Sequence, residues 1–414
     1  MNEPKKAPKA LIELAQNLEV QSIFKHVLSP QGLAVKKLIL SVHKGYFEEN
    51  DASALLLELL TIAWMRNWQP NPSPEQKDFS DQDKKEILAG WVRELFSYPK
   101  NYVLRLELPS IHGLAESRLK IMSGVHLVHG NEMLTQRQEK PGSAQTNLAN
   151  ALMPVTEIQQ TYLEVEIKGY ADSDINSLGM SAALSKARQC LYVLSARGLL
   201  TWQYEYLAPS PRAEVESVTN GVTTDIRLPT STASLLRYHT LNLDRLRLPD
   251  DNAPTLLGQV QGRSPEGAEE ICKAFLFGLK EAASYLATIS DPDFECVAAA
   301  IDWFYDCQFG DNQTVAYLAG CIGLESILGA EESMSELSSR LCDRYAFLLG
   351  KNKNERKAMS EEYKKILNLR GQLVHAKKPR LPGDQKDALF KVRSMLDKVI
   401  WHEICNIRNY RLQG

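Results

Sequence analysis

The sequence has 414 residues, of which 44% are hydrophobic and 24% are charged. This composition is that of an ordinary folded protein with enough apolar surface to bury a core, and the length predicts two domains. The 48 basic residues nearly balance the 51 acidic ones, and the net charge is −3. A generally basic nucleic-acid-binding chain is therefore excluded, and any contact with nucleic acid must come from a local basic patch.

The N-terminus and the cysteines indicate the cellular compartment of the protein. No apolar stretch follows the first ten residues, and no segment reaches the roughly 18 to 20 apolar residues that a membrane span requires. The seven cysteines are scattered and form no C-x-x-C pair, which indicates reduced thiols and argues against structural zinc. We therefore expect a cytoplasmic protein with no membrane contact, no metal and no cofactor.

Residues 1–255 are predicted to form an α+β region of unknown role, with sensing or regulation as candidate roles. Helices are expected where apolar residues show no strand alternation, at 9–66, from about 84 to 96, and at 181–197. Strands are expected where apolar and polar residues partly alternate, at 102–108, 119–128 and 162–167. Loops are expected at 69–83, which contains three prolines, and at 136–149, with short strand-like pieces at 209–254.

Residues 256–414 are predicted to form an all-helical bundle. Helices are expected at 268–288, 294–305 and 312–328, followed by one that begins at Ser333 and ends at Gly350. Ser333 with Glu336 has the spacing of a capping box, and a glycine is typical after a helix end. A charged connector is expected at 351–357, and Ser360 is expected to cap the next helix. The last helix is expected at 387–404, with four inward residues, Leu389, Val392, Leu396 and Val399.

The segment Tyr363–His375 contains the strongest candidates for catalytic residues. Its predicted buried stripe consists of Tyr363, Ile366, Leu367, Leu373 and Val374, and Arg370 falls on this stripe. A buried arginine is costly unless it is paired or faces a cavity. In a regular helix His375 lies about 140° around the axis from Arg370, so the two would not share a face. A bend or restart at the intervening Gly371 would bring both side chains to one cleft.

An arginine and a histidine together fit metal-free cleavage of RNA. The reaction needs the 2′-hydroxyl deprotonated, the developing phosphorane charge held and the 5′-oxygen protonated. An imidazole can move these protons, and a guanidinium can hold the phosphate with forked donors. Residues 351–380 contain ten basic and three acidic residues, which predicts a surface for a polyanion. Its candidate RNA-binding residues are Lys364, Lys365, Lys377 and Lys378. On spacing alone, a structural ion pair of Arg370 beside a surface His375 remains the alternative.

Four blocks of the last third of the chain resemble the ApeA-like branch of the HEPN family. They are Ala300-Ile-Asp-Trp-Phe304, Gly323-Leu-Glu-Ser-Ile-Leu328, Cys342-Asp-Arg-Tyr-Ala-Phe-Leu-Leu349, and the stretch from Tyr363 to Arg370-Gly-Gln-Leu-Val-His375. The last block fits the family's R-x(4–6)-H signature in its four-residue form. The order and spacing of all four blocks are more specific than any one of them.

The resemblance implies a helical bundle that pairs with a second copy, so that two R-x-x-x-x-H motifs line one cleft. It implies a metal-independent endoribonuclease that leaves 2′,3′-cyclic phosphate and 5′-OH ends, often in toxin or antiphage defence systems. Arg370 and His375 would be the catalytic pair, with Glu325, Arg344 and Tyr363 in support. RNA, a second copy and a phage-derived trigger or an antitoxin are the implied partners. Many active members carry a polar residue where this chain has Gly371, which favours the alternative of a non-catalytic module that dimerises or binds RNA or protein.

The residues around Glu325 also predict an ion pair. Its helix is apolar on most faces, at Val315, Leu318, Ile322, Leu324 and Leu328. The carboxylate therefore needs a partner, for which Arg344 or Arg340 is the candidate, and a purely structural ion pair is the alternative.

Weaker signals occur in the first half of the chain. Glu166 and Lys168, within Glu164-Val-Glu-Ile-Lys168, form an E-x-K, half of a magnesium-dependent nuclease pattern, but no aspartate occurs from 101 to 171. Alternating charges on an exposed strand face are the expected explanation. His126 and His129 are three apart on a strand and face opposite sides, so no metal site is expected. Three tryptophans are expected in the core, Trp64, Trp68 and Trp91.

Overall fold

The computed structural model describes most, but not all, of the chain. The described residues are 7–18, 25–67, 79–109, 118–129, 161–171, 177–202, 213–219, 222–226, 241, 246–247, 265–289, 295–310, 312–329, 337–375, 380–381 and 386–413. The chain divides into two compact units that each combine several segments. One contains residues 1–103, 166–183 and 215–227, and the other contains 104–165, 184–214 and 228–414. The predicted boundary at residue 255 lies outside the described residues.

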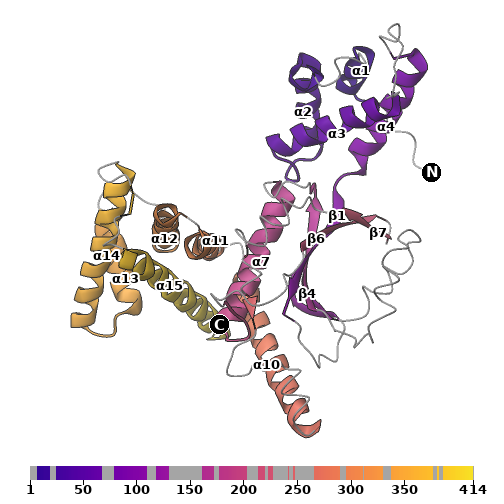
Figure 1. The fold of residues 1–414 in the computed structure, drawn as a ribbon. Coiled ribbons are helices and arrows are strands. Elements are labelled where there is room, and N and C mark those ends of the chain that lie inside the picture. Colours follow the sequence, from indigo (N-terminus) through magenta and orange to yellow (C-terminus); the bar gives the residue numbers. More distant parts are fainter. Residues whose placement is uncertain are drawn as a thin grey trace. The chain divides into compact units, whose positions relative to one another are not determined.

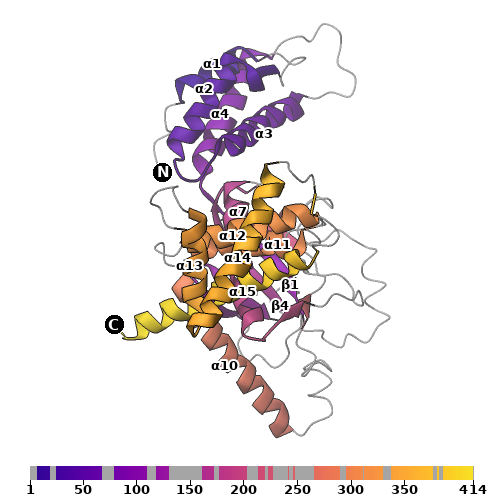
Figure 2. The same cartoon turned by 90° about the vertical axis from the view of Figure 1, so that its left-hand side faces the viewer.

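The N-terminal residues form a group of helices, as predicted for 9–66. The helices are α1 (Lys9–Gln16), α2 (Pro30–Val42), α3 (Glu49–Asn67) and α4 (Asp81–Ser97), and they lie together in Figures 1 and 2. The Ser80 side chain and Asp83 form a reciprocal capping box at the start of α4. Because this cap begins the helix at Asp81, the predicted loop was too long at its C-terminal end. Residues 68–78 lie outside the described residues.

Aromatic and aliphatic side chains fill the core between these helices. Trp91 is 1% exposed, and its indole Nε1 donates a hydrogen bond to the carbonyl oxygen of Leu59 at 2.8 Å. Trp64 is partly buried against the same core. The core positions of these two tryptophans are confirmed, and Trp68 lies outside the described residues.

A six-stranded sheet follows, and its strand order is β2-β3-β4-β1-β6-β7. The strands are β1 (Lys100–Leu108), β2 (Arg118–Met122), β3 (Val125–His129), β4 (Thr161–Gly169), β6 (Ala213–Thr219) and β7 (Val222–Ile226). Two short strands, β5 (Thr201–Trp202) and β8 (Leu246–Arg247), pair separately. The predicted strands at 102–108 and 162–167 are confirmed.

The single strand predicted at 119–128 was wrong, because this segment is an antiparallel hairpin. Met122 is opposite Val125, so the turn consists of Ser123 and Gly124 alone. Gly124 has a φ of 72°, a conformation that glycine adopts without the steric cost of a side chain. The Ser-Gly dipeptide was the available signal for the turn.

The described C-terminal residues are helical, as predicted, and contain no strand between 265 and 413 (Figures 1 and 2). The helices are α10 (Pro265–Ile289), α11 (Glu295–Phe309), α12 (Gln313–Leu328), α13 (Leu337–Leu349), α14 (Lys353–Val374) and α15 (Lys386–Gln413), and α7 (Leu178–Ala196) precedes them. An α+β N-terminal half followed by a helical C-terminal part is therefore shown. The inward positions predicted for α15 are confirmed, at Leu389, Val392, Leu396 and Val399.

The start of α14 differs from its prediction. The Asn352 side chain accepts hydrogen bonds from the backbone N–H groups of Asn354 and Glu355 and begins the helix at Lys353. Residues 353–357 are therefore helical, and Ser360 lies inside the helix. Asparagine caps a helix as well as serine does, and the charged residues that suggested a connector are good helix formers. Gly350 follows the end of α13 as predicted, and Ser333 and Glu336 lie outside the described residues.

Two further sequence expectations concern membranes and thiols. In the part of the chain that the structure describes, no helix is long and apolar enough to cross a membrane. The six cysteines whose side chains are described are all free thiols, and four of them are buried, at Cys190, Cys307, Cys321 and Cys342.

Close packing of α12 against α11 and α15 gives a first testable prediction. A Cβ atom added at Gly323 would lie 2.8 Å from Leu396 Cδ2 and 3.0 Å from Trp303 Cβ. We expect Gly323→Ala to lower the free energy of unfolding by about 1–3 kcal/mol, as overpacked cores do. The matched control is Gly371→Ala in α14, where a Cβ would meet nothing within 4 Å, and we expect it to stabilise by about 0.5–1 kcal/mol. Urea denaturation of both variants checks this, and equal effects would contradict the packing.

Candidate active site

Arg370 lies near the C-terminal end of α14, and its side chain forms an ion pair with α12. Its side chain is 33% exposed, and the guanidinium Nη2 donates to Glu325 Oε2 at 3.2 Å. The buried residues of α14 are Tyr363, Ile366, Leu369 and Leu373. The predicted stripe was therefore partly wrong, because Leu369 is buried while Leu367 is half-buried and Val374 is 51% exposed. Arg370 lies beside this buried stripe, and its ion pair with Glu325 compensates the charge of the guanidinium at the edge of the core.

Glu325 pairs with Arg370, and the predicted partners Arg344 and Arg340 were wrong. The Arg344 guanidinium instead donates to the carbonyl oxygen of Leu328 at 2.5 Å and satisfies the C-terminal end of α12. The two helices that carry Glu325 and Arg370 pack against one another, and the pair joins residues 45 apart in the sequence. Val315, expected on the apolar surface of α12, is 60% exposed because it lies in the first turn of the helix.

Buried aromatic side chains support α14 beside this ion pair. The Tyr317 hydroxyl donates to the carbonyl oxygen of Ile366 at 2.8 Å, one helical turn before Arg370. The rings of Tyr363 and Tyr345 have centroids 5.3 Å apart. Burial is the largest cause that raises the pKa of the Tyr363 hydroxyl above its ordinary value, so this side chain is neutral. Tyr363 therefore acts as a core residue that fixes α14, and it is not exposed to a substrate.

His375 is exposed at the C-terminal end of α14, and the predicted bend at Gly371 was wrong. The helix continues through Gly371 to Val374, and the His375 N–H donates to the carbonyl oxygen of Gly371 at 3.1 Å. Because the helix is regular, His375 lies about 140° around the axis from Arg370. The structure therefore places both predicted residues on one helix but does not bring them to one cleft within a single chain.

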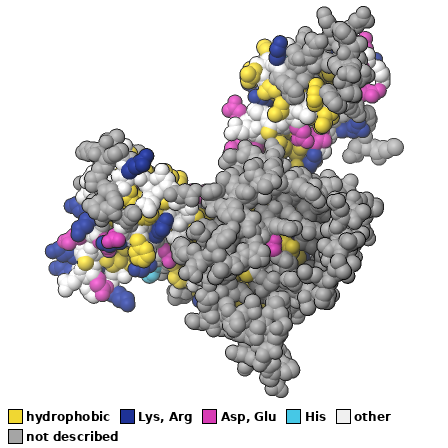
Figure 3. Space-filling model, viewed as in Figure 1, with side chains coloured by type: hydrophobic (Ala, Val, Ile, Leu, Met, Phe, Trp, Pro, Cys, Tyr) yellow, Lys and Arg dark blue, Asp and Glu magenta, His cyan; other side chains and the backbone are white. Residues whose placement is uncertain are grey.

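Basic side chains line the outside of α14. Lys364 and Lys365 are exposed, as are Lys353 and Lys357, while Lys377 and Lys378 lie outside the described residues. Figure 3 shows Lys and Arg side chains gathered over the C-terminal helices. Local acids interrupt the patch, because Glu361 is also exposed. The exposed side of α14 therefore carries both basic and acidic side chains.

The sheet corrects another expectation, because Glu164 is buried. Its side chain is 2% exposed, and its two carboxylate oxygens accept hydrogen bonds from Arg105 Nε and Arg118 Nη1, each at 2.6 Å. Glu166 and Lys168 are exposed, as the alternation predicts. His126 lies opposite Glu164 on the neighbouring strand, and the His129 side chain is outside the described residues. Alternation predicted the strand correctly but could not show that one charged position is covered.

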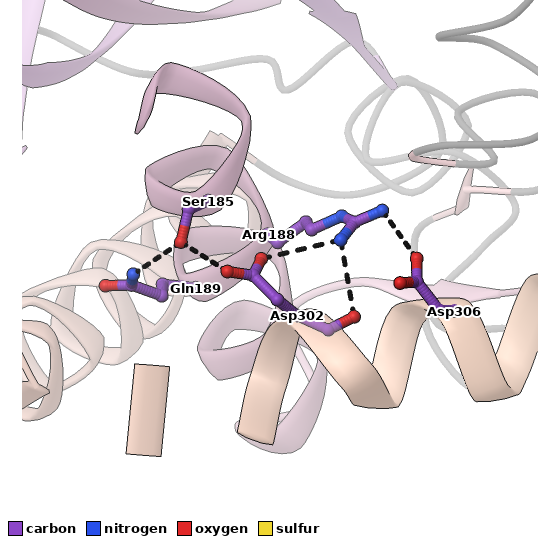
Figure 4. Close-up of polar contacts among 5 residues, drawn as sticks. All are labelled: Ser185, Arg188, Gln189, Asp302 and Asp306. Atoms are coloured by element: carbon purple, nitrogen blue, oxygen red, sulfur yellow. Dashed lines mark hydrogen bonds and ion pairs between the residues drawn. The ribbon is translucent and has the colours of Figure 1, made fainter. Parts of the chain in front are cut away.

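Sequence reasoning missed a polar network between α7 and α11, drawn in Figure 4. The Ser185 hydroxyl donates to Asp302 Oδ2 at 2.6 Å, and Arg188 Nη2 donates to Asp306 Oδ1 at 2.9 Å. The Arg188 guanidinium also lies over the ring of Tyr305, with its Cζ 5.5 Å from the centroid. Burial raises the pKa of the Asp302 carboxyl, and the hydrogen bond from Ser185 opposes this. The i,i+4 spacing of the two aspartates on α11 was the only sequence signal. The network fixes α7 on α11.

Comparisons with protein-family models, with curated proteins and with solved structures found no match to this chain. The functional argument consequently depends on the residues of the site and on their order along the chain.

Proposed function

We propose that residues 256–414 form a metal-independent endoribonuclease of the HEPN type, similar to its ApeA-like branch, with Arg370 and His375 as its catalytic residues. The four blocks of the resemblance fall in order on α11, α12, α13 and α14. The ion pair between Glu325 and Arg370 carries the proposal most directly, because it joins the second block to the R-x-x-x-x-H block in space. Glu325 and Arg370 are charged residues in helices whose buried residues are mostly apolar.

The proposed chemistry divides between the two side chains. An RNA phosphate would replace the Glu325 carboxylate as the partner of the Arg370 guanidinium. Arg370 would then stabilise the negative charge that develops on the phosphorane. Exposed His375 would accept the proton of the 2′-hydroxyl or donate one to the departing 5′-oxygen. The nucleophile is the neighbouring ribose hydroxyl, so the products would end in 2′,3′-cyclic phosphate and 5′-OH. Lys364 and Lys365 would hold adjacent phosphates.

Assembly gives the second prediction. Arg370 and His375 lie on different sides of α14, so a complete site in this proposal needs a second copy of the chain. We expect a two-fold homodimer through the helical region, since closed two-fold symmetry is the commonest arrangement. Multi-angle light scattering with and without RNA checks this. A strict monomer in both conditions would contradict the proposed assembly.

A non-catalytic HEPN module that dimerises or binds RNA or protein is the second candidate. Two observations favour this module: the Arg370 guanidinium is already paired with the Glu325 carboxylate, and position 371 is a glycine. An RNA cleavage assay in EDTA distinguishes the two functions. Cleavage that survives the chelator supports the ribonuclease, and RNA binding without any cleavage supports the module.

By analogy with the family alone, the setting is a cytoplasmic bacterial defence or toxin system. The α+β region would then sense a trigger of phage origin or restrain the nuclease, or an antitoxin would neutralise it. Cleavage of cellular RNA on expression of the protein, with loss of growth, is the outcome that this setting requires.

A further inference from the structure

One side of α12 carries polar groups toward α14. Tyr317, Cys321 and Glu325 recur every four residues, so they share one side of α12. The Tyr317 hydroxyl donates a hydrogen bond to the carbonyl oxygen of Ile366 in α14 at 2.8 Å. Glu325 Oε2 accepts from Arg370 Nη2, also in α14, at 3.2 Å. Because both contacts join the same two helices, this side of α12 faces α14.

Tyr363 adds an unpaired hydroxyl to this interface. Tyr363 lies seven residues before Arg370, which is almost two full turns, so both side chains leave α14 on nearly the same side. The Tyr363 side chain is 0% exposed, and its hydroxyl has no hydrogen-bond partner among the residues that the structure describes. Burial is the largest cause that raises the pKa of this hydroxyl, and the charges of Cys321 and Glu325 raise it further. The Glu325 carboxylate therefore lies in the neighbourhood of the Tyr363 hydroxyl.

The proposed reaction leaves Glu325 without its partner. When an RNA phosphate replaces the carboxylate at Arg370, Glu325 keeps its negative charge and is only 25% exposed to water. A buried hydroxyl that makes no hydrogen bond is also costly, because it has lost water without a substitute. An ionised carboxylate only accepts hydrogen bonds, and a neutral phenol can donate one. The displaced Glu325 and the unpaired Tyr363 hydroxyl thus match each other chemically.

We propose that Tyr363 is a positioning residue, whose hydroxyl donates a hydrogen bond to the Glu325 carboxylate when an anion has displaced that carboxylate from Arg370. Glu325 then alternates between two partners, Arg370 in the free protein and Tyr363 in the complex. The inference rests on the proposed function for the identity of the anion, which is an RNA phosphate. Tyr363 touches no substrate, and it acts by lowering the free energy that is needed to release Arg370.

Thermal unfolding of the full chain tests the two partners without RNA. Arg370→Met removes the guanidinium and supplies no other donor, so Glu325 should turn to Tyr363. In that background Tyr363→Phe removes a hydrogen bond that is in use and should lower Tm by about 2–4 °C. In the wild type the same substitution removes an unpaired hydroxyl, so Tm should stay equal or rise. Equal effects of Tyr363→Phe in the two backgrounds overturn the proposal.

Two further variants assign the effect to this pair of groups. Tyr345→Phe removes the hydroxyl of the ring that packs on Tyr363, with centroids 5.3 Å apart, and is the control. Its effect on Tm should be the same with and without Arg370→Met. When Glu325→Met removes the carboxylate, Tyr363→Phe should likewise have the same effect in both backgrounds. A difference that persists without the carboxylate means that the hydroxyl acts through another group, and this result overturns the proposal.

Binding of a 2′-deoxy-substituted RNA tests the same step in the complex. Tyr363→Phe should weaken this binding roughly 3- to 10-fold, because the complex loses a hydrogen bond that the free protein never had. A wild-type protein that binds the RNA no better than Tyr363→Phe does overturns the proposal. A wild-type protein that binds no RNA contradicts the proposed function instead, and the thermal comparison, which uses no RNA, still decides whether Tyr363 is the second partner of Glu325.

Discussion

Replacement of His375 by alanine is expected to reduce RNA cleavage about 100- to 10,000-fold, the range that general acid–base groups contribute. His375 is exposed at the end of α14, and its backbone N–H makes the bond to Gly371. The substitution keeps that backbone bond, so we expect Tm to change little. Cleavage of a labelled RNA in EDTA, with product ends identified by phosphatase and kinase treatment, measures the effect. The products of the wild type should carry 2′,3′-cyclic phosphate.

The control is His402→Ala, which removes a partly exposed histidine from α15 that lies outside the R-x-x-x-x-H motif. This variant should cut RNA at the wild-type rate. A substrate with 2′-deoxyribose at the cleavage site should resist the wild-type protein, because the nucleophile is missing. Wild-type cleavage by His375→Ala, or loss of cleavage in EDTA, would show that the proposed site is wrong.

Local sequence signals predicted which helices and strands form more accurately than they predicted where each element begins and ends. Apolar spacing predicted the C-terminal helices, and alternation predicted β1 and β4, because each pattern reports one side chain after another along the chain. The start of α14 at Asn352 and the turn at Ser123 and Gly124 depend on single residues with several possible roles. A cap or a turn is therefore easily assigned one position away from its true one, or missed.

Contacts between distant segments could not be predicted in the same way. Arg344 and Arg340 were plausible partners of Glu325 from their chemistry, yet the packing of α14 on α12 presents Arg370 to it. Glu164 was expected in solvent because it is charged, although two arginines from other strands cover its carboxylate. Residue type sets which contacts are favourable, and tertiary packing decides which of them form.

Arg370→Lys is expected to reduce cleavage about 100- to 1000-fold, comparable to the loss of one donor that stabilises a developing oxyanion. Lysine keeps the positive charge and can still pair with Glu325, but it lacks the planar fork that holds two phosphate oxygens. The ion pair is partly exposed, at 33% for Arg370 and 25% for Glu325, and contributes only about 0–1 kcal/mol to stability. The variant should therefore remain folded, with a Tm close to that of the wild type.

Binding and cleavage measured together distinguish the role of Arg370 from that of its neighbours. A 2′-deoxy-substituted RNA reports binding without turnover, and Arg370→Lys should bind it nearly as well as the wild type does. Lys364→Gln should instead weaken this binding and reduce its dependence on salt, because one phosphate contact is removed. If Arg370→Lys cleaves at the wild-type rate, the arginine holds no phosphate in the transition state and its pair with Glu325 is structural. If the wild type binds RNA and does not cleave it, the helical region is a binding module, and Arg370 serves only to join α14 to α12.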